Sequence, residues 1–485
     1  MRCVMVVRNL RGSWARRLTM EIAMREVEKN KVVFFDAQNY EFFPPNLKVG
    51  VFPSAALREK FFSRLKYKNS GFKAGSDELV AKGGVVKQLR GILIRAEVFR
   101  FALKVIKLNF REDIKNLEID KNNIGRALDG VFVGISGSTL YQLSDISFVQ
   151  KFRAAAIFVG SYYKFNSLFR MYNIDCLYLV NGRDALGSGC LASCILNEVE
   201  FFTLERGHLQ KSEYTPTLGI WKGNMHKWRN RKSLLTLKLK EYDLQEAKKI
   251  AGITFNNSFG LSSKWWDGKE KTVVVPGVNI PNQPFISFFS TSEIEFSGIQ
   301  DEAGIVEESE QITQFILLKT VAKELGINLV LRLHPNSGSK GYRFETLKWS
   351  ELVKDDPHVF LISGSNPLDS YQLGSLSLNN FFYRSSLAAE FIRMRLPVSL
   401  LAETFWSTNE PGLVSKNANE ILEVLENPTR NFKDESWVNF GFYYGSTGEE
   451  FRFFSFKKAN GILREFFNGV AIDIPRWRHS GASRG

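Results

Sequence analysis

Two short stretches decide the fold: residues 285–290, with the sequence FISFFS, and residues 328–333, with the sequence NLVLRL. Both are apolar enough to predict buried strands, and the segment between them has the periodicity of a helix that ends at Gly326. The alternation continues, and it predicts helices over residues 346–353, 371–376 and 386–394 and strands over residues 359–362, 380–383 and 398–401. Apolar strands that alternate with helices are typical of a parallel sheet covered on both sides. We therefore expect residues 270–440 to form a doubly wound α/β domain.

The first half of the chain contains similar pieces with less regularity. The pattern predicts strands over residues 32–35, 130–135 and 177–180, with a crossover helix over residues 148–172. We interpret residues 1–260 as a second α/β domain with an irregular insertion near residues 37–125. The other predicted parts are a linker at residues 260–284, a C-terminal helical segment at 441–475 and a basic tail at 476–485. The fold class is thus α/β, with two Rossmann-like domains.

The composition sets broad limits on function. Of the 485 residues, 44% are hydrophobic and 24% are charged, which excludes disorder for most of the chain. The four cysteines are too few for a disulfide framework and lack zinc-ligand spacing, which indicates a reducing compartment. No apolar run approaches the roughly 18 to 20 residues of a membrane-spanning helix. Arg8 and Arg11 follow the apolar N-terminus too closely for a signal peptide, so we expect a cytoplasmic protein.

The formal net charge of +14 predicts an anionic partner: a nucleic acid, an acidic membrane face or a phosphate-bearing small molecule. Residues 221–240 contain seven Lys and Arg and no acid, with Trp221, His226 and Trp228 interleaved. A solvated surface is the simplest interpretation, and contact with phosphates or a membrane is the functional one. Residues 290–311 contain seven Asp and Glu and no base, in part as expected for the approach to a helix N-terminus.

Polar side chains follow three strands of the second domain, beyond the carboxyl ends where open parallel sheets bind ligands. They are Ser292 after the first strand, Arg332 and His334 after the second, and Ser385, Ser386 and Glu390 after the fourth. An anionic ligand such as a nucleotide phosphate would explain this combination. Four of these residues also have a simpler explanation: Ser385 and Ser386 as helix caps, His334 as a surface-loop residue and Glu390 as a carboxylate on a helix surface.

The order and spacing of these loops resemble the C-terminal half of capsule and surface-polysaccharide glycosyltransferases of GT-B type. The motifs are FISFFSTSEIEF at 285–296, RLHPN at 332–336, LDSY at 368–371 and SSLAAE at 385–390, ahead of Leu396 and Pro397. In the first half, VNGR at 180–183, ERGH at 205–208 and the basic stretch around His226 and Trp228 resemble that family's acceptor-domain loops. The resemblance implies two Rossmann-like domains that face a cleft. It further implies that the C-terminal domain binds a nucleotide-sugar donor through Arg332, His334, Ser385, Ser386, Glu390 and Ser292, with Glu390 at a ribose hydroxyl.

The N-terminal domain would then bind a glycan or lipid-linked glycan acceptor, whose attacking hydroxyl needs a base. Glu205, His208 and Asp184 are the candidates, and we favour Glu205 because it precedes Gly207, which lets the backbone approach a substrate. The competing interpretation of Glu205 is a salt bridge to Arg206. We expect Asn181, Arg183 and His226 to contact the acceptor.

Motifs that are missing from the sequence narrow the chemistry. There is no Asp-x-Asp pair to hold Mn²⁺ or Mg²⁺, so we expect metal-independent transfer with no cofactor beyond the nucleotide sugar, which is a substrate. A paired-acid-then-glycine motif is not evident in the expected domain, which argues against CMP-sialic acid and leaves CMP-Kdo, UDP-sugar and GDP-sugar donors open. An anionic inner membrane face is a further expected partner, at which the enzyme would be peripheral.

Two other functions compete with this interpretation. The first is a nucleotide-sugar epimerase or hydrolase on the same fold. The second is a basic nucleic-acid-binding protein without catalysis. Residues 221–240 contain no helix-turn-helix, RNP motif or zinc ligands, so we do not expect a nucleic-acid partner.

Overall fold

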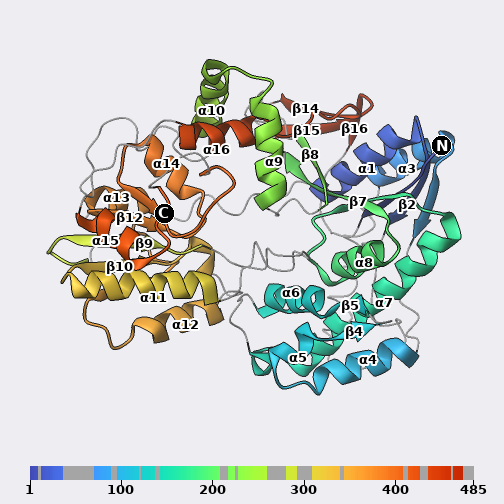
Figure 1. Ribbon diagram of the computed structural model, residues 1–485. Helices are drawn as coiled ribbons and strands as arrows, with labels where there is room; N and C mark the ends of the chain where they lie inside the picture. Colours follow the sequence, from blue (N-terminus) through green and yellow to red (C-terminus); the bar gives the residue numbers. More distant parts are fainter. Residues whose placement is uncertain are drawn as a thin grey trace. The chain divides into compact units, whose positions relative to one another are not determined.

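The computed structural model describes residues 1–8, 13–36, 70–88, 96–119, 122–136, 142–207, 217–223, 228–258, 280–291, 309–338, 343–407, 413–426, 435–459 and 462–472. The chain forms two compact units (Figure 1). The first unit comprises Met1–Leu103, Ala155–Gly223 and Gly448–Gly485, and the second comprises Lys104–Ala154 and Asn224–Thr447. Each unit is therefore assembled from separated segments, unlike the two continuous domains expected from the sequence.

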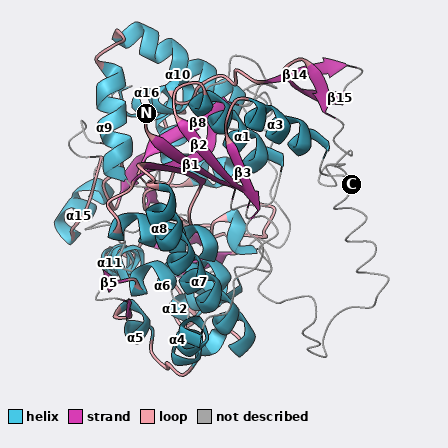
Figure 2. Ribbon diagram, turned by 90° about the vertical axis from the view of Figure 1, so that its right-hand side faces the viewer, coloured by secondary structure: helices cyan, strands magenta, loops and turns pink. Residues whose placement is uncertain are grey.

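A six-stranded sheet lies at the centre of the first unit, in the order β3-β2-β1-β6-β7-β8. Its strands are β1 (Cys3–Arg8), β2 (Lys31–Asp36), β3 (Val85–Gln88), β6 (Cys176–Val180), β7 (Glu200–Gly207) and β8 (Thr217–Lys222). Neighbouring strands are parallel, except that β8 is antiparallel to β7. The principal helices are α1 (Ser13–Val27), α3 (Ser70–Ala81), α7 (Phe148–Tyr172) and α8 (Ala185–Leu196). Figure 2 shows β1, β2 and β3 side by side, with α1 and α3 beside them. This strand order is Rossmann-like.

Alternating side chains of β1 fill cores on both faces of this sheet. Val4 and Val6 belong to the core that includes α1, whereas Met5 and Val7 belong to the core that includes α7 and α8. α8 lies very close to α7 at Gly189, where an added Cβ would be 2.1 Å from Ser161 Oγ. A glycine is therefore required for this packing. The strands predicted at 32–35 and 177–180 and the helix predicted at 148–172 are confirmed.

The segment between α3 and α7 includes one wrong prediction. It contains α4 (Ala96–Ile106), α5 (Arg111–Lys115), α6 (Gly125–Ser136) and the short helix η1 (Leu143–Asp145). It also contains β4 (Glu118–Ile119) and β5 (Asn122–Asn123), which pair antiparallel. The strand predicted at 130–135 is wrong, because these residues lie in α6 and most are buried. A short apolar run does not distinguish a buried helix from a strand.

The second unit contains a five-stranded sheet in the order β11-β10-β9-β12-β13, with every neighbouring pair parallel. Its strands are β9 (Phe285–Phe289), β10 (Asn328–Arg332), β11 (Val359–Ile362), β12 (Asn380–Phe382) and β13 (Val398–Leu400). The intervening helices are α11 (Ser309–Glu324), η3 (Pro335–Gly338), α12 (Arg343–Val353), α13 (Ser370–Leu376) and α14 (Leu387–Arg393), and α15 (Ala418–Glu426) follows. Each strand and helix predicted between residues 285 and 401 is present. The two Rossmann-like α/β units expected from the sequence are therefore confirmed.

Three helices outside the sheet pack together in the second unit. α9 (Trp228–Leu239), α10 (Leu244–Ser258) and α16 (Glu435–Ser446) share a core with β9 and α14 that includes Phe255 and Trp437. Gly441 permits the close approach of α16 to α10, because a Cβ there would lie 2.7 Å from the Phe255 ring. Residues 228–258 thus pack with the second unit and not with the predicted N-terminal domain, because Leu235, Ala247, Ala251 and Phe255 are buried in its core.

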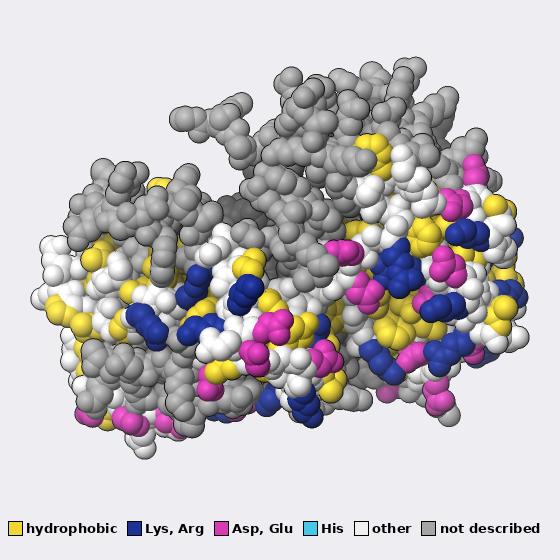
Figure 3. All heavy atoms as spheres, turned by 90° about the horizontal axis from the view of Figure 1, so that it is seen from above, with side chains coloured by type: hydrophobic (Ala, Val, Ile, Leu, Met, Phe, Trp, Pro, Cys, Tyr) yellow, Lys and Arg dark blue, Asp and Glu magenta, His cyan; other side chains and the backbone are white. Residues whose placement is uncertain are grey.

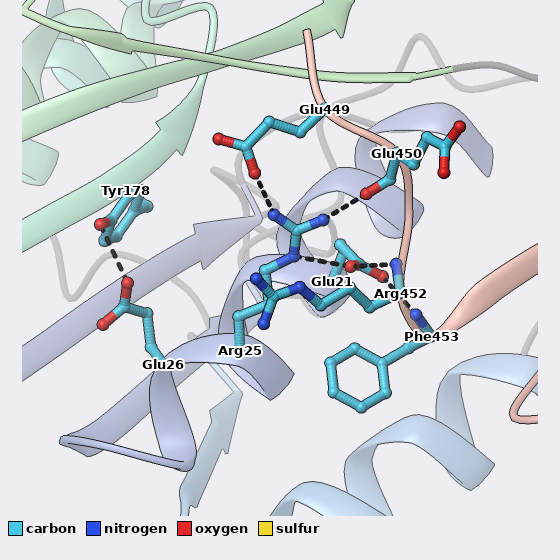
Figure 4. A network of polar contacts seen from close by, with 8 residues as sticks. All are labelled: Glu21, Arg25, Glu26, Tyr178, Glu449, Glu450, Arg452 and Phe453. Carbon is cyan, nitrogen blue, oxygen red and sulfur yellow. Dashed lines mark hydrogen bonds and ion pairs between the residues drawn. The ribbon is translucent and has the colours of Figure 1, made fainter. Parts of the chain in front are cut away.

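The C-terminal segment returns to the first unit as a sheet. β14 (Phe454–Ala459), β15 (Ile462–Phe467) and β16 (Val470–Ile472) pair antiparallel, so the helical prediction for 441–475 is wrong beyond α16. Phe454 and Phe467 enter the core beside α1. Figure 4 shows how the approach to β14 is attached to α1: the buried carboxylate of Glu21 accepts the backbone N–H groups of Arg452 and Phe453. The tail at 476–485 lies outside the described residues.

Candidate functional site

The sheet of the second unit defines where a ligand is expected. Its strand order reverses between β9, the first strand in sequence, and β12, the fourth, and open α/β sheets bind ligands at such a switch point beyond the carboxyl ends of the strands. Thr291 follows β9 and donates its hydroxyl to the carbonyl of Tyr383, which follows β12. The Thr291 backbone is held in turn by Gln311 of α11, whose Oε1 accepts the Thr291 N–H at 2.8 Å. The two loops at the switch point are therefore attached to each other.

A third loop is attached to the same edge. The backbone N–H of His334, beyond β10, donates to Ser290 Oγ at 2.9 Å, and the His334 carbonyl accepts bonds from Ser337 N at 2.9 Å and Ser337 Oγ at 2.6 Å. Ser290 and Ser337 are buried, whereas His334 is half-buried. Hydrogen bonds thus fix both the N–H and the carbonyl of His334, which lies at the carboxyl edge of the sheet, as the sequence analysis predicts.

The structure gives Arg332 internal partners. Its side chain is buried, and its guanidinium donates to the carbonyls of Ser363, Asn366 and Leu368, the last two at 3.1 Å. Burial lowers the pKa of Arg332, an effect that Asp369 opposes. Both terminal nitrogens therefore bind the loop between β11 and α13. The sequence analysis had instead predicted that Arg332 contacts the donor phosphate.

The helix that follows β12 begins as predicted at the paired serines. Ser385 Oγ accepts the backbone N–H of Leu387 at 3.3 Å and so caps α14, whereas Ser386 makes no capping bond with its side chain. Arg384, just before them, has φ 53°, a left-handed conformation that is uncommon for a residue with a Cβ. Backbone strain at this position sets the direction in which the chain leaves the switch point.

Glu390 is only 5% exposed, so the alternative of a carboxylate on the helix surface is wrong. Its carboxyl group accepts the hydroxyl of Tyr371 from α13. Burial raises the pKa of Glu390 to about 7, although the Tyr371 hydrogen bond and Arg393 both act to lower it. The pKa of Tyr371 is raised as well, first by its own burial and then by Glu390. With a pKa of about 7, Glu390 is present in both its protonated and its ionised form near neutral pH.

Sequence reasoning missed a polar cluster at the switch point. The Tyr383 hydroxyl donates to Glu310 in the first turn of α11, and Arg384 Nη2 lies 3.5 Å from Glu310 Oε2. The Arg384 guanidinium also stacks 5.3 Å from the centre of the Tyr383 ring. Glu310 was visible only as a member of the acidic run at 290–311. Its place at the start of the predicted helix, just before the apolar face of α11, is the signal that could have identified it.

In the first unit, three of the predicted residues come together where β6 and β7 end. Asn181 Nδ2 donates to Glu205 Oε2 at 3.2 Å, and Arg183 Nε donates to Asn181 Oδ1 at 2.7 Å. Asn181 and Gly182 have φ values of 61° and 80°, which turn the chain sharply after β6. The half-buried Glu205 carboxylate is thus oriented by Asn181. The structure thus brings together three residues that the sequence analysis named separately, Glu205 as a candidate base and Asn181 and Arg183 as candidate acceptor contacts.

Asp184 has a different environment from Glu205. It is the N-cap of α8, and its Oδ1 accepts the backbone N–H groups of Leu186 and Gly187, both at 3.1 Å. This carboxylate oxygen is engaged in starting the helix. Asp184 is therefore less suited than Glu205 to receive a proton from a substrate.

The remaining predicted residues are distributed as follows. His208, His226 and Ser292 lie outside the described residues. Of the basic stretch, Trp221 is buried in β8, Lys222 Nζ lies 2.6 Å from Glu200 Oε1, and Lys238 Nζ donates to the Ser446 carbonyl at 2.7 Å. These contacts account for part of the charge run without a ligand. In the part of the chain that the structure describes, no group of three or more His, Cys, Asp or Glu is placed to hold a metal ion.

The chain matches no protein-family model and no curated protein. Among solved structures it is similar to S. aureus MnaA in complex with UDP, with 11% identity, 93% of this chain and 94% of that chain covered, and a TM-score of 0.27. It is also similar to UDP-GlcNAc 2-epimerase of Methanocaldococcus jannaschii, with 9% identity, coverage of 91% and 98%, and a TM-score of 0.28. A third similar structure is KpsC of Thermosulfurimonas dismutans, described as a beta Kdo 2,4 transferase, with 14% identity, coverage of 55% and 78%, and a TM-score of 0.33. At such low identities and TM-scores, these likenesses assign no activity to the chain.

Proposed function

We propose that the chain is a GT-B glycosyltransferase that moves a sugar from a nucleotide-sugar donor to a surface-polysaccharide or lipid-linked glycan acceptor without a metal ion. One observation supports this most directly. The three loops whose order resembles that of capsule glycosyltransferases are attached to one another at a single sheet edge, through Ser290 and Thr291. A fixed, polar edge at a switch point is suited to binding a nucleotide.

On the donor side, His334 and the N–H groups near Ser385 and Ser386 would face the departing phosphate, where negative charge develops. Arg332 would act indirectly, since its guanidinium shapes the neighbouring loop. Glu390 would accept a hydrogen bond from a ribose hydroxyl in exchange for Tyr371, or beside it. Burial thus separates Arg332, which is buried and holds a loop, from His334, which is half-buried at the same edge.

On the acceptor side, Glu205 would serve as the base for the attacking hydroxyl. Asn181 orients one of its carboxylate oxygens, and Arg183 orients Asn181. A base held in one rotamer before the substrate binds transfers a proton more efficiently than a mobile one. We keep His208 as a second candidate base and His226 as a candidate acceptor contact.

The cellular setting remains part of the proposal. We place the enzyme in the cytoplasm, at the inner face of the plasma membrane, where a basic protein is attracted to anionic lipid. Within the part of the chain that the structure describes, no helix is long and apolar enough to cross a membrane. Figure 3 shows one face of the molecule, on which Lys and Arg side chains lie among acidic and hydrophobic ones.

A thermal-shift screen with CMP, UDP and GDP tests the donor site. We expect one nucleotide to stabilise the wild type and His334→Ala to lose that stabilisation while it keeps its fold. His358→Ala is the matched control, because His358 precedes β11 and so lies at the opposite, amino edge of the same sheet. Equal stabilisation of His334→Ala and wild type would refute the donor-site assignment.

Product analysis separates the competing functions. The protein is incubated with the matching nucleotide sugar, without and with an acceptor glycan, and the products are analysed by mass spectrometry and NMR. Transfer predicts turnover only with the acceptor. Epimerised or hydrolysed sugar without acceptor would replace the proposal with the epimerase or hydrolase, and salt-sensitive binding of duplex DNA with no nucleotide response would replace it with a nucleic-acid-binding function.

A further inference from the structure

Arg384 lies at the switch point of the second unit's sheet. It follows β12 by two residues, and the carbonyl of the intervening Tyr383 accepts the Thr291 hydroxyl from the loop after β9. Its φ of 53° is left-handed, a conformation that a residue with a Cβ keeps only where the surroundings hold it. The backbone of Arg384 is therefore fixed at the end of one of the two strands between which the strand order reverses.

The side chain of Arg384 is held by two neighbours. Its Cζ lies 5.3 Å from the centre of the Tyr383 ring, and Tyr383 is only 2% exposed. Arg384 Nη2 lies 3.5 Å from Glu310 Oε2, the same oxygen that accepts the Tyr383 hydroxyl. A buried ring and a carboxylate in the first turn of α11 thus determine where the guanidinium lies. An arginine that is oriented before its ligand arrives loses less conformational freedom on binding.

The Arg384 guanidinium still has hydrogen-bonding capacity for a ligand, because it contains five N–H donors. Among the residues that the structure describes, it has one ion pair and one ring contact, and its buried Nε has no hydrogen-bond partner. At 3.5 Å the ion pair is longer than a charged hydrogen bond, and the side chains of Arg384 and Glu310 are 22% and 44% exposed. Such an ion pair is weak, so an anion of higher charge can compete with Glu310.

Other charged residues beyond these strands have partners of their own. Arg332 donates both terminal nitrogens to carbonyls of the loop that follows β11. Lys416 Nζ lies 2.5 Å from Glu403 Oε1, in the loop after β13. That hydrogen bond is the main cause that lowers the pKa of Glu403, and Lys232 and Arg384 add smaller effects. Arg384 is therefore better suited than Arg332 to contact an anion at this edge.

We propose that Arg384 contacts the phosphate of the nucleotide-sugar donor, in the role that the sequence analysis gave to Arg332. The inference rests on the proposed glycosyltransferase function and deepens it by naming the cation of the donor site. The planar fork of an arginine matches two phosphate oxygens, which attract it more strongly than the single contact with Glu310. A cation at this position also stabilises the negative charge that develops on the departing phosphate.

Calorimetric titration separates a phosphate contact from a merely structural role. CMP, UDP, GDP, their nucleosides and sodium pyrophosphate are titrated at constant ionic strength into the wild type, Arg384→Gln and Arg395→Gln. Arg395 is the matched control, because it also has a left-handed φ, 62°, and it precedes β13 at the opposite, amino edge of the same sheet. We expect Arg384→Gln to bind the nucleotide at least about tenfold more weakly than the wild type, as for loss of a charged hydrogen bond, and the nucleoside equally well. Arg395→Gln should bind both as the wild type does.

If Arg384→Gln does not fold, Arg384→Lys takes its place, since it keeps the charge and removes the fork. Equal nucleotide affinity of the folded variant and the wild type would overturn the phosphate contact and leave the donor proposal in place. Equal losses for nucleotide and nucleoside would also overturn it, because Arg384 would then only support the fold of the site. A wild type that binds pyrophosphate through Arg384 but no nucleotide would refute the donor proposal and leave the phosphate contact in place. A wild type that binds no probe would overturn both.

Discussion

The attachment of the C-terminal segment to α1 is expected to depend on one carboxylate. Glu21 is fully buried, and its oxygens accept Arg25 Nε at 2.7 Å, Arg452 N at 2.7 Å and Phe453 N at 3.0 Å. Arg25 extends the network to Glu449 and to the Glu450 carbonyl, as Figure 4 shows. The substitution Glu21→Gln keeps the shape of the side chain and removes its charge and one acceptor oxygen. It therefore isolates the electrostatic part of the attachment.

The size of the effect follows from the three bonds. In its better orientation the amide keeps its oxygen toward Arg25 and Arg452, and its NH₂ group then meets the N–H of Phe453. The unsatisfied buried donor costs about 1 to 3 kcal/mol, and each of the two remaining bonds loses about 1 kcal/mol when its acceptor becomes neutral. We expect a total loss of about 3 to 5 kcal/mol, in the range for removing one partner of a buried ion pair.

Urea unfolding and hydrogen exchange measure this loss. Because the chain has two units, the unfolding transition of the first unit is followed, and exchange is read in the peptide that contains Arg452 and Phe453. A loss of 3 kcal/mol corresponds to exchange about a hundredfold faster there. Glu26→Gln is the matched control: Glu26 lies on the same helix, accepts the Tyr178 hydroxyl at 3.1 Å and is half-buried, so we expect about 1 kcal/mol or less. The reasoning is refuted if Glu21→Gln costs no more than Glu26→Gln.

Three further predictions concern the sites and the packing. Because the pKa of Glu390 is raised to about 7 from 4.5, its protonated form stabilises the fold below pH 4.5, and this contribution falls as the pH rises to about 7. Glu390→Gln should remove a slope of up to about 1.4 kcal/mol per pH unit from that window in urea unfolding, and identical slopes would contradict the assignment. Gly189→Ala should destabilise by at least about 2 kcal/mol, since its Cβ would lie 2.2 Å from a backbone carbonyl of α7. By contrast, a Cβ at Gly252 in α10 would meet open space, so Gly252→Ala should stabilise the protein by about 0.5 to 1 kcal/mol. Equal melting temperatures of the Gly189→Ala and Gly252→Ala variants would show the described packing to be wrong. Ser290→Ala leaves the His334 N–H without its acceptor and should cost about 1 to 3 kcal/mol, with faster exchange of that amide as the measurable sign. Unchanged exchange at His334 would show that Ser290 does not hold the loop.

The second sheet could be predicted almost element by element, for a physical reason. Its strands are buried on both faces, so they appear as continuous apolar runs, and Gly326 or polar loops separate them from the helices. α6 shows where this logic fails. Residues 130–135 are as apolar as a strand, but the helix that contains them is buried on most of its surface, which removes the periodic signal.

The C-terminal sheet was missed for another reason. β14–β16 take their place beside α1 through contacts with residues more than 400 positions away, such as Glu21 with Arg452. Local sequence preference contains little information about such pairings. β1 was overlooked for a similar reason: the apolar residues before Arg8 are few, and their strand is specified by neighbours far along the chain, β2 and β6.

The sequence predicts where polar residues lie at the strand ends, but it does not predict what those residues contact. Two arginines at strand ends show this. Arg332 ends β10 and Arg8 ends β1, and both are buried. Arg332 donates both terminal nitrogens to fixed carbonyls of the loop it shapes, and its buried Nε has no hydrogen-bond partner among the described residues. Arg8 instead has a charged partner, the Asp36 carboxylate, whose Oδ2 lies 3.8 Å from Arg8 Nη1. Neutral carbonyls accept hydrogen bonds from a guanidinium, whereas a carboxylate also offsets its charge. The same residue type at a strand end therefore has neutral partners in one unit and a charged partner in the other, and only the three-dimensional neighbours distinguish them.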